Sequence, residues 1–138
     1  MMSNTLSGMS LVEPTVDTRP WWEALARGEL TVPTCHSCSK KFFPPQAFCC
    51  NCGSSDWSCD PSDGVGKLYS WVVIHHAFSP EVADKVPYAI VAVDLDDGGR
   101  LIGRLLGEPS GLQNSMPMRA RIFLENGNPL LGFEPALA

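Results

Sequence analysis

The feature that most constrains this chain is a pair of Cys-x-x-Cys motifs, Cys35–Cys38 and Cys49–Cys52, separated by ten residues. Each motif forms a tight turn whose two sulfurs converge on one ion, and the spacer is long enough for a hairpin that brings the second turn opposite the first. Four thiolates close a tetrahedral shell around zinc and leave no open position for a substrate. The motifs therefore predict a structural zinc site. Iron held by the same four sulfurs, and disulfides in place of a metal, are the alternatives.

Three further side chains lie near the motifs or could be mistaken for ligands. Ligands within one turn are three residues apart, so Cys49 and Cys52 fit this spacing and Cys50 is expected to point away. His36, inside the first motif, is expected to be solvated. Cys59 has no partner at motif spacing and is interpreted as a small buried hydrophobic residue.

The length and charge of the chain limit the remaining choices. A chain of 138 residues forms one domain, or two small domains that share a core. A net charge of −5 without a basic stripe disfavours nucleic acid as the main partner. No apolar run approaches the roughly 20 residues that a membrane span requires. Residues 1–16 resemble a disordered leader more than a signal peptide, and reduced thiols without an export signal predict the cytoplasm.

A short helix is expected before the first cysteine. Residues 17–20 supply a cap candidate and a proline for the first turn, and Gly28 can end the helix in the left-handed conformation. Trp21 and Trp22 project about 100° apart on a helix, so they cannot both face one narrow groove. We expect one of them to cover the core of the protein and the other to bind a partner, where Trp is enriched. Packing of both inside the protein is the alternative.

The rest of the chain predicts a mainly β fold. Two strands, 30–34 and 56–59, flank the cysteines and complete a zinc ribbon, and a turn cluster at 60–64 marks a boundary. We therefore expect an N-terminal helix and zinc ribbon at 17–60 and a second unit at 61–138. That unit contains five strand-like runs, for which a small barrel of the OB type is predicted and an open five-stranded sandwich is the alternative. The runs are 66–76, 88–95, 101–106, 118–125 and 130–133.

Strict alternation predicts which side chains face the interior of this barrel. The first run, 66–76, is apolar on both faces, so one face should fill the interior while the other is covered by the ribbon or a partner. In the run 118–125, alternation places Ile122 and Leu124 inside and Arg121 outside.

These segments, taken in order, resemble the acyl-CoA-associated family in which a rubredoxin-like zinc ribbon is fused to an OB fold. The resemblance extends from about Arg19 to Phe133. Each motif is weak alone, but their order and spacing are specific. In this sequence they are the paired tryptophans, Gly28-x-Leu30, the first C-x-x-C, Phe43-Pro44-Pro45, the C-x-x-C-G, Gly66-x-Leu68-Tyr69-Ser70, Val86-Pro87-Tyr88 and Met116-Pro117-Met118.

Four positions depart from the family pattern. Ser39 stands where a glycine usually follows the first turn, and Ser115 replaces the glycine before Met-Pro. Gln46 stands where an arginine usually follows the two prolines, and Cys50 stands where a proline usually lies. The change at Gln46 weakens the expectation that this position binds a phosphate or a partner carboxylate.

The resemblance implies a non-catalytic accessory subunit. Members of this family accompany thiolases, acyltransferases or hydratases of lipid, steroid or polyketide-type acyl-CoA metabolism, and they help form the channel through which acyl-CoA reaches the active site of the partner. Trp21 and Trp22 are then candidates for partner binding. No cluster of Arg and Lys able to clamp phosphate is visible, so free CoA is expected to bind only weakly.

The sequence itself does not assemble a catalytic site. His75 and His76 end a strand-like run and Asp94, Asp96 and Asp97 lie near a later turn, but no spacing forces them together. Two other classes stay open. A zinc ribbon with an OB barrel is also typical of single-stranded nucleic-acid-binding proteins, and four sulfurs around iron would make a rubredoxin-like electron carrier.

Overall fold

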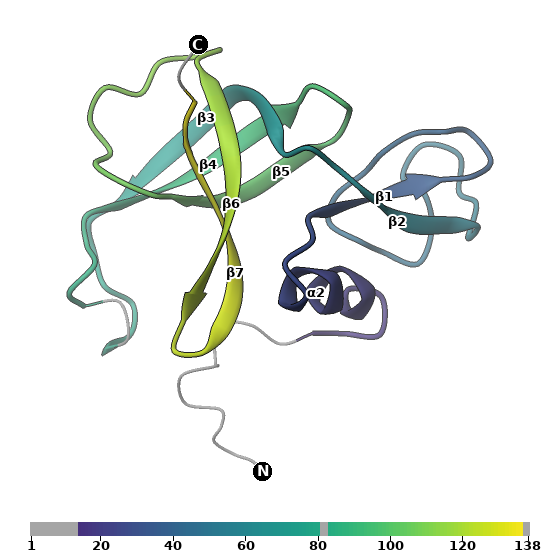
Figure 1. Cartoon of the computed structure of the whole chain (residues 1–138), viewed down its shortest axis with the longest axis horizontal. Coiled ribbons are helices and arrows are strands. Elements are labelled where there is room, and N and C mark those ends of the chain that lie inside the picture. The colour runs from purple at the N-terminus through teal and green to yellow at the C-terminus, as the bar shows by residue number, and fades with distance from the viewer. Residues whose placement is uncertain (1–13, 81–82, 137–138) are drawn as a thin grey trace.

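The computed structural model describes residues 14–80 and 83–136, which form one helix, a two-stranded ribbon and a five-stranded barrel (Figure 1). The helix, α2, spans Arg19–Ala26 and lies below the ribbon in this view. Its start lies within the predicted segment: Thr18 is the N-cap residue, and Thr15 and Thr18 exchange backbone-to-side-chain hydrogen bonds of 2.8 and 3.2 Å. Its end is as predicted: Gly28 has φ +84°, and Glu29 N donates to Ala24 O at 2.9 Å.

The zinc ribbon is built on an antiparallel pair of strands. Strand β1 (Thr31–Cys35) pairs with β2 (Trp57–Pro61), and the cysteine-bearing turns lie in the segment between them. A small separate core of three buried side chains, Cys35, Phe42 and Cys49, holds this segment together. Trp57 packs edge-on against Phe42, with their ring centroids 5.6 Å apart.

The five remaining strands close into a barrel and confirm the predicted OB topology. They are β3 (Val65–Ile74), β4 (Tyr88–Leu95), β5 (Arg100–Leu105), β6 (Pro117–Glu125) and β7 (Asn128–Pro135). The strand order is β3-β4-β5-β7-β6, with β5 and β7 parallel and the other pairs antiparallel. Because the barrel is closed, the open sandwich is excluded.

The core of the barrel continues into the helix and the base of the ribbon. Trp21 and Leu25 of α2 and Val32 of β1 belong to the same buried cluster as the side chains inside the barrel. The helix therefore docks on both units, which a helix of eight residues needs for stability. The barrel members of the cluster are Leu68, Ala89, Val91, Val93, Leu95, Leu101, Leu105, Met118, Leu131 and Phe133.

The predicted alternation along β3 is wrong beyond its first few residues. The register with β4 shifts between Leu68 and Ser70, and this β-bulge turns the following side chains to the opposite face. Strict alternation would put Leu68 and Val72 on one face, but Leu68 is buried while Val72 is 57% exposed, and Trp71 and Val73 pack against the core instead.

The prediction for the end of β6 is also wrong. Leu124 is 72% exposed, although alternation places it inside. Beyond Arg119, β6 pairs with β7 but no longer with β3, so its end belongs to a long hairpin rather than to the barrel wall. Figure 1 shows this β6–β7 hairpin extending toward α2. Ile122, nearer the barrel, does pack against the core.

Two expectations concern the ends and divisions of the chain. Residues 1–13 of the predicted leader lie outside the described residues, whereas Thr15 belongs to the start of the helix. The division into units at 17–60 and 61–138 stays a prediction. Within the described residues, no helix has the length and apolar character needed to cross a membrane.

Candidate metal centre and neighbouring surfaces

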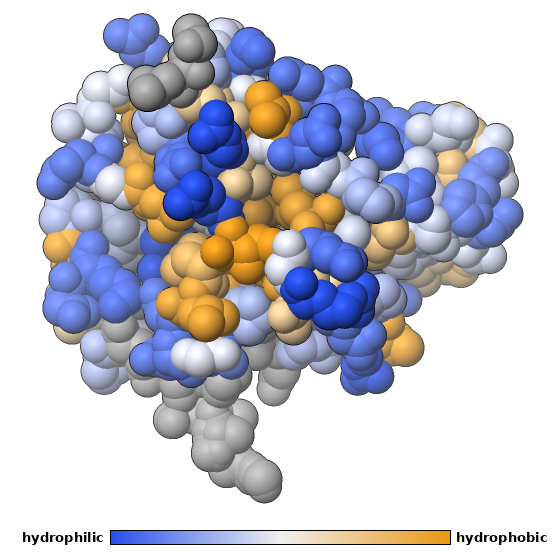
Figure 2. Space-filling model, in the orientation of Figure 1, coloured by the Kyte–Doolittle hydropathy of each residue, from blue (hydrophilic) through white to orange (hydrophobic). Residues whose placement is uncertain are grey.

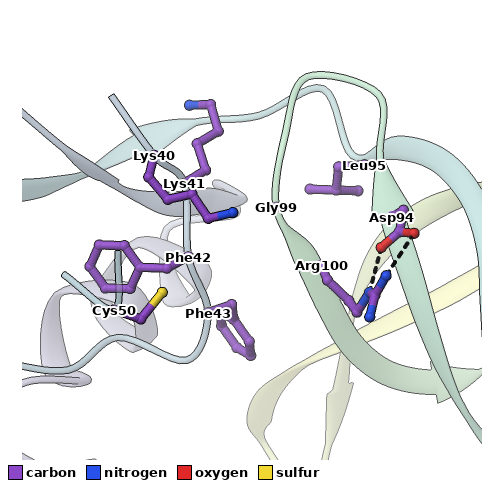
Figure 3. Close-up of a pocket in the computed structure, with 9 residues that line it drawn as sticks. All are labelled: Lys40, Lys41, Phe42, Phe43, Cys50, Asp94, Leu95, Gly99 and Arg100. Carbon is purple, nitrogen blue, oxygen red and sulfur yellow. Dashed lines mark hydrogen bonds and ion pairs between the residues drawn. The ribbon is translucent and has the colours of Figure 1, made fainter. Parts of the chain in front are cut away.

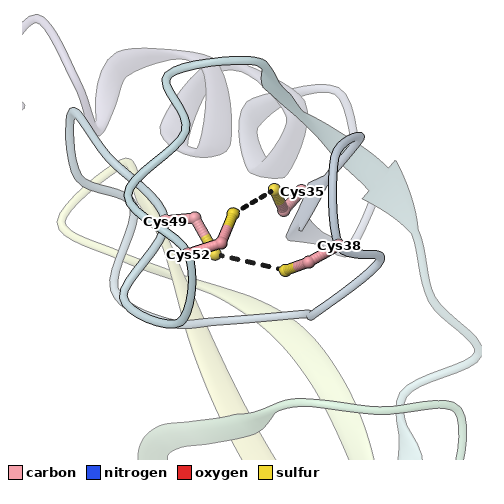
Figure 4. Close-up of side chains that lie close together, drawn as sticks. All are labelled: Cys35, Cys38, Cys49 and Cys52. Carbon is pink, nitrogen blue, oxygen red and sulfur yellow. Dashed lines mark hydrogen bonds between the residues drawn. The ribbon is translucent and has the colours of Figure 1, made fainter.

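The structure brings together the four cysteines predicted to bind the metal (Figure 4). The sulfurs of Cys35, Cys38, Cys49 and Cys52 all lie within 4.8 Å of one another. Cys35 Sγ is 3.6 Å from Cys52 Sγ, and Cys38 Sγ is 3.7 Å from Cys49 Sγ. The pairs in contact are thus formed between the two motifs, which face each other across the site.

This arrangement fits a tetrahedral zinc ion. With a zinc–sulfur distance of about 2.3 Å, the sulfurs of a regular tetrahedron are about 3.8 Å apart. The two closest sulfur pairs lie close to this value. A zinc ion bound here would cross-link the two turns, and with all four positions taken by sulfur it would have a structural rather than a catalytic role.

Hydrogen-bond donors around the site favour thiolates. Cys35 and Cys49 accept backbone N–H groups from Ser37 and Asn51 at 3.4 and 3.3 Å. The side-chain amide of Asn51 also donates to Cys38 Sγ at 3.4 Å. This amide and the Lys40 backbone N–H lower the pKa of Cys38 to about 6. This role of Asn51 was not identified from the sequence, where its position inside the second motif was the only indication.

The pKa shifts of Cys35 and Cys52 have opposite directions. The Cys38 backbone N–H lowers the pKa of Cys35. The Ser54 backbone N–H also lowers the pKa of Cys52, but the neighbouring thiols, chiefly Cys35, and burial together raise it to about 12. Four negative charges this close repel one another, and a divalent cation removes that repulsion.

The other three residues considered at the motifs lie outside the four-sulfur cluster. Cys50 is exposed. His36 is held at the surface, with Nδ1 3.0 Å from Asp56 Oδ1 and Nε2 2.8 Å from Ser58 Oγ. Cys59 is half-buried, and burial raises the pKa of its thiol. The assignment of the four ligands stays a prediction that this geometry fits.

The two serines that replace family glycines both adopt left-handed backbone conformations. Ser39 has φ +68° and Ser115 has φ +69°. Ser39 N donates to Cys35 O at 3.0 Å and so closes the first cysteine turn. These turns require a positive φ that glycine adopts without strain and serine does not. The positive φ explains why glycine is the usual residue at these two positions in the family.

A pocket of about 520 Å³ lies between the ribbon and the barrel, and we call it the ribbon–barrel pocket (Figure 3). On the ribbon side, Lys41 and Phe43 face it, and Lys41 Nζ donates to Thr34 Oγ1 at 2.9 Å. On the barrel side, Arg100 binds both oxygens of Asp94 at 2.6 and 3.1 Å. The full lining is Lys40, Lys41, Phe42, Phe43, Cys50, Asp94, Leu95, Gly99 and Arg100.

This pocket brings together cationic side chains from distant parts of the sequence, while weak binding of free CoA stays a prediction. Lys40 and Lys41 are adjacent in sequence, and the fold adds Arg100 from the barrel. Arg100 is neutralised by Asp94, whereas neither lysine forms an ion pair with a carboxylate in the described part of the chain. The ribbon side of the pocket therefore carries uncompensated positive charge.

The histidines and aspartates considered for catalysis are not brought together. Ile74, just before His75 and His76, pairs with Tyr88 at one end of the β3–β4 hairpin. Asp94 pairs with Lys67 at the other end. Seven residues of strand separate the two ends, a distance of roughly 23 Å. A proton-transfer pair between these groups is excluded in this structure.

The two tryptophans have different surroundings. Trp21 is 4% exposed, and its Nε1 donates to Thr31 O at 2.9 Å, which ties the helix to the ribbon. Trp22 is half-buried, stands edge-on to Trp21 at 4.8 Å and lines a groove against the barrel. Trp22 is therefore the indole that a partner could reach directly, while Trp21 holds it in place.

A short helix, a zinc ribbon with four converging sulfurs and an OB barrel, with the helix packed on both other units, define the class of this protein. The chain belongs to the ChsH2/DUF35 family of such proteins. The model described as "ChsH2, rubredoxin-like zinc ribbon domain" matches residues 22–58, and "ChsH2, C-terminal OB-fold domain" matches residues 60–123. The resemblance noted from the sequence is confirmed.

Solved structures agree with this assignment. A chain of the structure titled "Ltp2-ChsH2(DUF35) aldolase" is 31% identical and superposes with a TM-score of 0.80, over 91% of this chain and 99% of that one. A DUF35 protein of unknown function from Sulfolobus solfataricus is 14% identical with a TM-score of 0.57, and it supports the fold alone.

Curated relatives carry names from acyl-CoA metabolism. A "Probable enoyl-CoA hydratase alpha subunit" of Thermomonospora curvata is 35% identical over 103 residues, which are 74% of this chain and 32% of that protein. The "3-oxo-4,17-pregnadiene-20-carboxyl-CoA hydratase alpha subunit" of Mycobacterium tuberculosis is 43% identical over 43% of this chain and 19% of its own length. The chain thus spans about a third or less of these two relatives.

A third relative matches over most of its own length. The "DUF35 domain-containing scaffold protein" of Methanothermobacter thermautotrophicus is 28% identical over 93 residues, which are 67% of this chain and 69% of that protein. Two of these three relatives are named as subunits of acyl-CoA hydratases and one as a scaffold protein.

Proposed function

We propose that this chain is a non-catalytic accessory subunit that binds a thiolase- or acyltransferase-like enzyme and helps form its acyl-CoA channel. The observation that carries the proposal is the superposition on a chain of the Ltp2-ChsH2(DUF35) aldolase, which spans 99% of that chain. The chemistry of the described residues supports it, because the metal shell is closed by four sulfurs and the candidate catalytic groups lie at opposite ends of a hairpin.

In this proposal, zinc has a structural role in the ribbon. Cys35, Cys38, Cys49 and Cys52 hold the ion and thereby fix the segment that carries Lys40 to Phe43. Thiolate ligands stay reduced most readily in the cytoplasm, which is where we place the protein.

The partner binds at the helix. Trp22 provides a half-buried aromatic side chain, and Trp21 positions it through the edge-on contact of the two rings. Aromatic side chains of this kind dominate the binding energy of many interfaces.

Acyl-CoA is bound at the interface between the two proteins. The ribbon–barrel pocket supports a direct contact, since Lys40 and Lys41 offer two ammonium groups and Phe43 an aromatic ring. Phosphate groups and an adenine ring of CoA suit these side chains. Isothermal titration calorimetry should detect weak binding of CoA. The double variant Lys40→Ala/Lys41→Ala should weaken this binding, whereas the control variant Lys67→Ala should leave it unchanged.

Co-expression with the thiolase-like enzyme encoded beside this chain tests the function, with Ltp2 of the solved aldolase as a second candidate partner. We expect the two proteins to co-purify, the isolated chain to show no turnover of acyl-CoA, and the complex to be active. Trp22→Ala should reduce both co-purification and activity without loss of zinc. Thiolysis, hydration or acyl transfer by the isolated chain at the rate of the complex would contradict an accessory role.

A further inference from the structure

The four cysteines of the metal centre differ in how far solvent can reach them. Cys52 is exposed, Cys38 is half-buried, and Cys35 and Cys49 are only 1% and 3% exposed. The ribbon that holds them has a core of just three buried side chains. In Figure 2 the end of the molecule that contains the ribbon carries mainly hydrophilic and intermediate side chains on the visible face. A small polar oxidant therefore has access to the centre from the side of Cys52.

The sulfurs in contact with each other belong to different motifs. Cys52 Sγ lies 3.6 Å from Cys35 Sγ, and Cys38 Sγ lies 3.7 Å from Cys49 Sγ. Each contact joins a more accessible cysteine to a buried one. Figure 4 shows that both contacts run from one cysteine turn to the other. Oxidation of either pair would therefore join the two motifs rather than close a loop within one of them.

The other two of the six thiols are placed differently. Cys50 is exposed and lines the ribbon–barrel pocket, outside the four-sulfur cluster. Cys59 is half-buried on β2, opposite Pro33 of β1. Oxidation at either position would leave the four clustered sulfurs in place. These two thiols are therefore internal controls for any chemistry of the cluster.

We propose that the metal centre is an oxidant-sensitive switch, in which hydrogen peroxide converts the four clustered thiolates into disulfides between the two motifs. Zinc and disulfides, between which the cysteine spacing leaves a choice, are then two states of the same four sulfurs. Disulfides in a reducing compartment are usually transient and redox-sensing, which agrees with such an exchange. This inference goes beyond the accessory function proposed above and does not depend on it.

The reaction begins at the accessible sulfur and ends at the buried one. Cys52 Sγ attacks peroxide: an S–O bond forms, the O–O bond breaks, and the departing hydroxide takes up a proton to become water. Cys35 Sγ then attacks Cys52 Sγ: the S–S bond forms, the S–O bond breaks, and a second hydroxide leaves and is protonated to water. Two electrons thus pass from two sulfurs to one peroxide. Cys38 and Cys49 react in the same way with a second peroxide, after which no thiolate is left to hold zinc.

The disulfide form differs from a ribbon that has only lost its metal. Bonds between the two motifs keep both cysteine turns cross-linked, so the segment with Lys40 and Lys41, which lies between the motifs, stays closed at its ends. A metal-free ribbon with reduced thiols has only its three-residue core. The switch is therefore reversible, because a reductant restores four thiolates that are already close together and can bind zinc again.

The test uses the full chain loaded with zinc and treated with a small excess of hydrogen peroxide. A colorimetric chelator follows the release of zinc, and dimedone in a parallel sample traps sulfenic acid. Peptide mapping by mass spectrometry then locates the trapped cysteine and the disulfides. Cys50→Ser and Cys59→Ser are the matched controls, since each removes one thiol outside the cluster.

We expect loss of the bound zinc to accompany a disulfide between Cys35 and Cys52, with dimedone attached to Cys52. Both control variants should release zinc at the rate of the unchanged chain. A phosphine reductant followed by zinc should restore the starting protein. Limited proteolysis should cut the oxidised ribbon more slowly than the reduced ribbon from which a chelator has removed the zinc.

Three results would overturn this inference. The first is oxidation of Cys50 alone with zinc retained, and the second is a main product with disulfides inside each motif, Cys35 to Cys38 and Cys49 to Cys52. Either of these leaves the accessory function standing. The third is a chain that cannot be loaded with zinc, which would also remove the structural role of the metal.

Discussion

The zinc ribbon and the OB barrel are held together in different ways. The buried cluster of the ribbon consists of Cys35, Phe42 and Cys49, two of which are metal-ligand candidates. The barrel buries ten aliphatic and aromatic side chains from its five strands, together with Trp21, Leu25 and Val32 from the helix and ribbon. Apolar burial can thus stabilise the barrel, whereas the ribbon has too little of it and depends on the metal.

This difference explains where each unit can carry function. A small loop-rich ribbon fixed by a metal can hold Lys40, Lys41 and Phe43 in place without a large core behind them. The barrel, which has its own interior, can leave apolar side chains such as Val72 and Ile102 on its outside. The four predictions that follow test this comparison, from the largest expected effect to the smallest.

Loss of one metal ligand should remove the structure of the ribbon. Cys35→Ser takes away a buried thiolate of the four-sulfur cluster, and structural zinc contributes roughly 10–16 kcal/mol of apparent binding free energy in zinc-finger peptides. We expect zinc content to fall toward zero and limited proteolysis to cut between β1 and β2. Cys50→Ser is the control and should keep its zinc. If Cys50→Ser loses zinc while Cys49→Ser retains it, the ligand assignment is wrong.

Emptying the barrel core should cost more than emptying the core of the zinc-loaded ribbon. Phe133 is fully buried, so Phe133→Ala should lower the free energy of unfolding by about 3–5 kcal/mol. Phe42→Ala should lower it less and should instead speed the release of zinc to a chelator, because Phe42 packs beside the cysteines. Urea denaturation and a colorimetric chelator measure the two effects. An equal loss of stability for both variants would show that the ribbon core acts independently of the metal.

The Arg104–Glu125 pair should make barrel stability depend on acid pH. Arg104 lowers the pKa of Glu125 below its ordinary value of 4.5 in the folded protein. The pair therefore stabilises the fold above the unfolded pKa, and this contribution is lost as the pH falls through the folded pKa. Glu125→Gln should cost about 1.5–3 kcal/mol at pH 7, the usual value for hydrogen bonds to charged groups, and nothing in strong acid.

A second ion pair on the same hairpin is the control for this pH dependence. Arg121 NH1 lies 3.5 Å from Glu134 Oε2, and the arginine side chain is 59% exposed. Glu134→Gln should change stability by less than about 1 kcal/mol at either pH. Unfolding curves at several pH values distinguish the two, and parallel curves for Glu125→Gln and the unchanged protein would contradict a role for the buried pair.

The smallest effects are expected at the two left-handed serines. Ser39→Gly in the ribbon and Ser115→Gly before β6 should each stabilise the fold by about 0.5–1 kcal/mol, since glycine relieves the strain of a positive φ. Ser39→Gly should also slow zinc release. Ser110→Gly, at a position without a positive φ, should be neutral or slightly destabilising. Thermal unfolding measures the stability of all three variants. A loss of stability in Ser39→Gly or Ser115→Gly would show that the serine backbone is not strained at that position.

Several parts of the fold could be predicted because their signals are local in the sequence. The spacing of three residues within each cysteine pair selected the same four sulfurs that the fold brings within 4.8 Å of one another, and Gly28 marked the end of α2. The order of five strand-like runs was sufficient for the OB topology, because turn clusters separate them clearly. The two positions at which serine replaces the glycine of the family, Ser39 and Ser115, both have a positive φ.

Other features depended on contacts between distant parts of the chain. Alternation could not foresee the bulge near Tyr69 or the exposure of Leu124, because a strand's inner face is set by the strands that pair with it. Nor could the sequence show which of Trp21 and Trp22 would be buried, since that depends on how α2 docks against β1 and the barrel.

The sequence by itself therefore determined the metal chemistry and the kind of fold, whereas the tertiary structure decided which surfaces exist. Cysteine spacing and turn residues act over a few positions and leave a readable pattern. The ribbon–barrel pocket joins Lys40 and Lys41 to Arg100, and the groove between α2 and the barrel joins Trp22 to Ile90 and Ile102. Such surfaces are assembled from segments about 60 to 80 residues apart, so only the packing of the helix and ribbon on the barrel creates them.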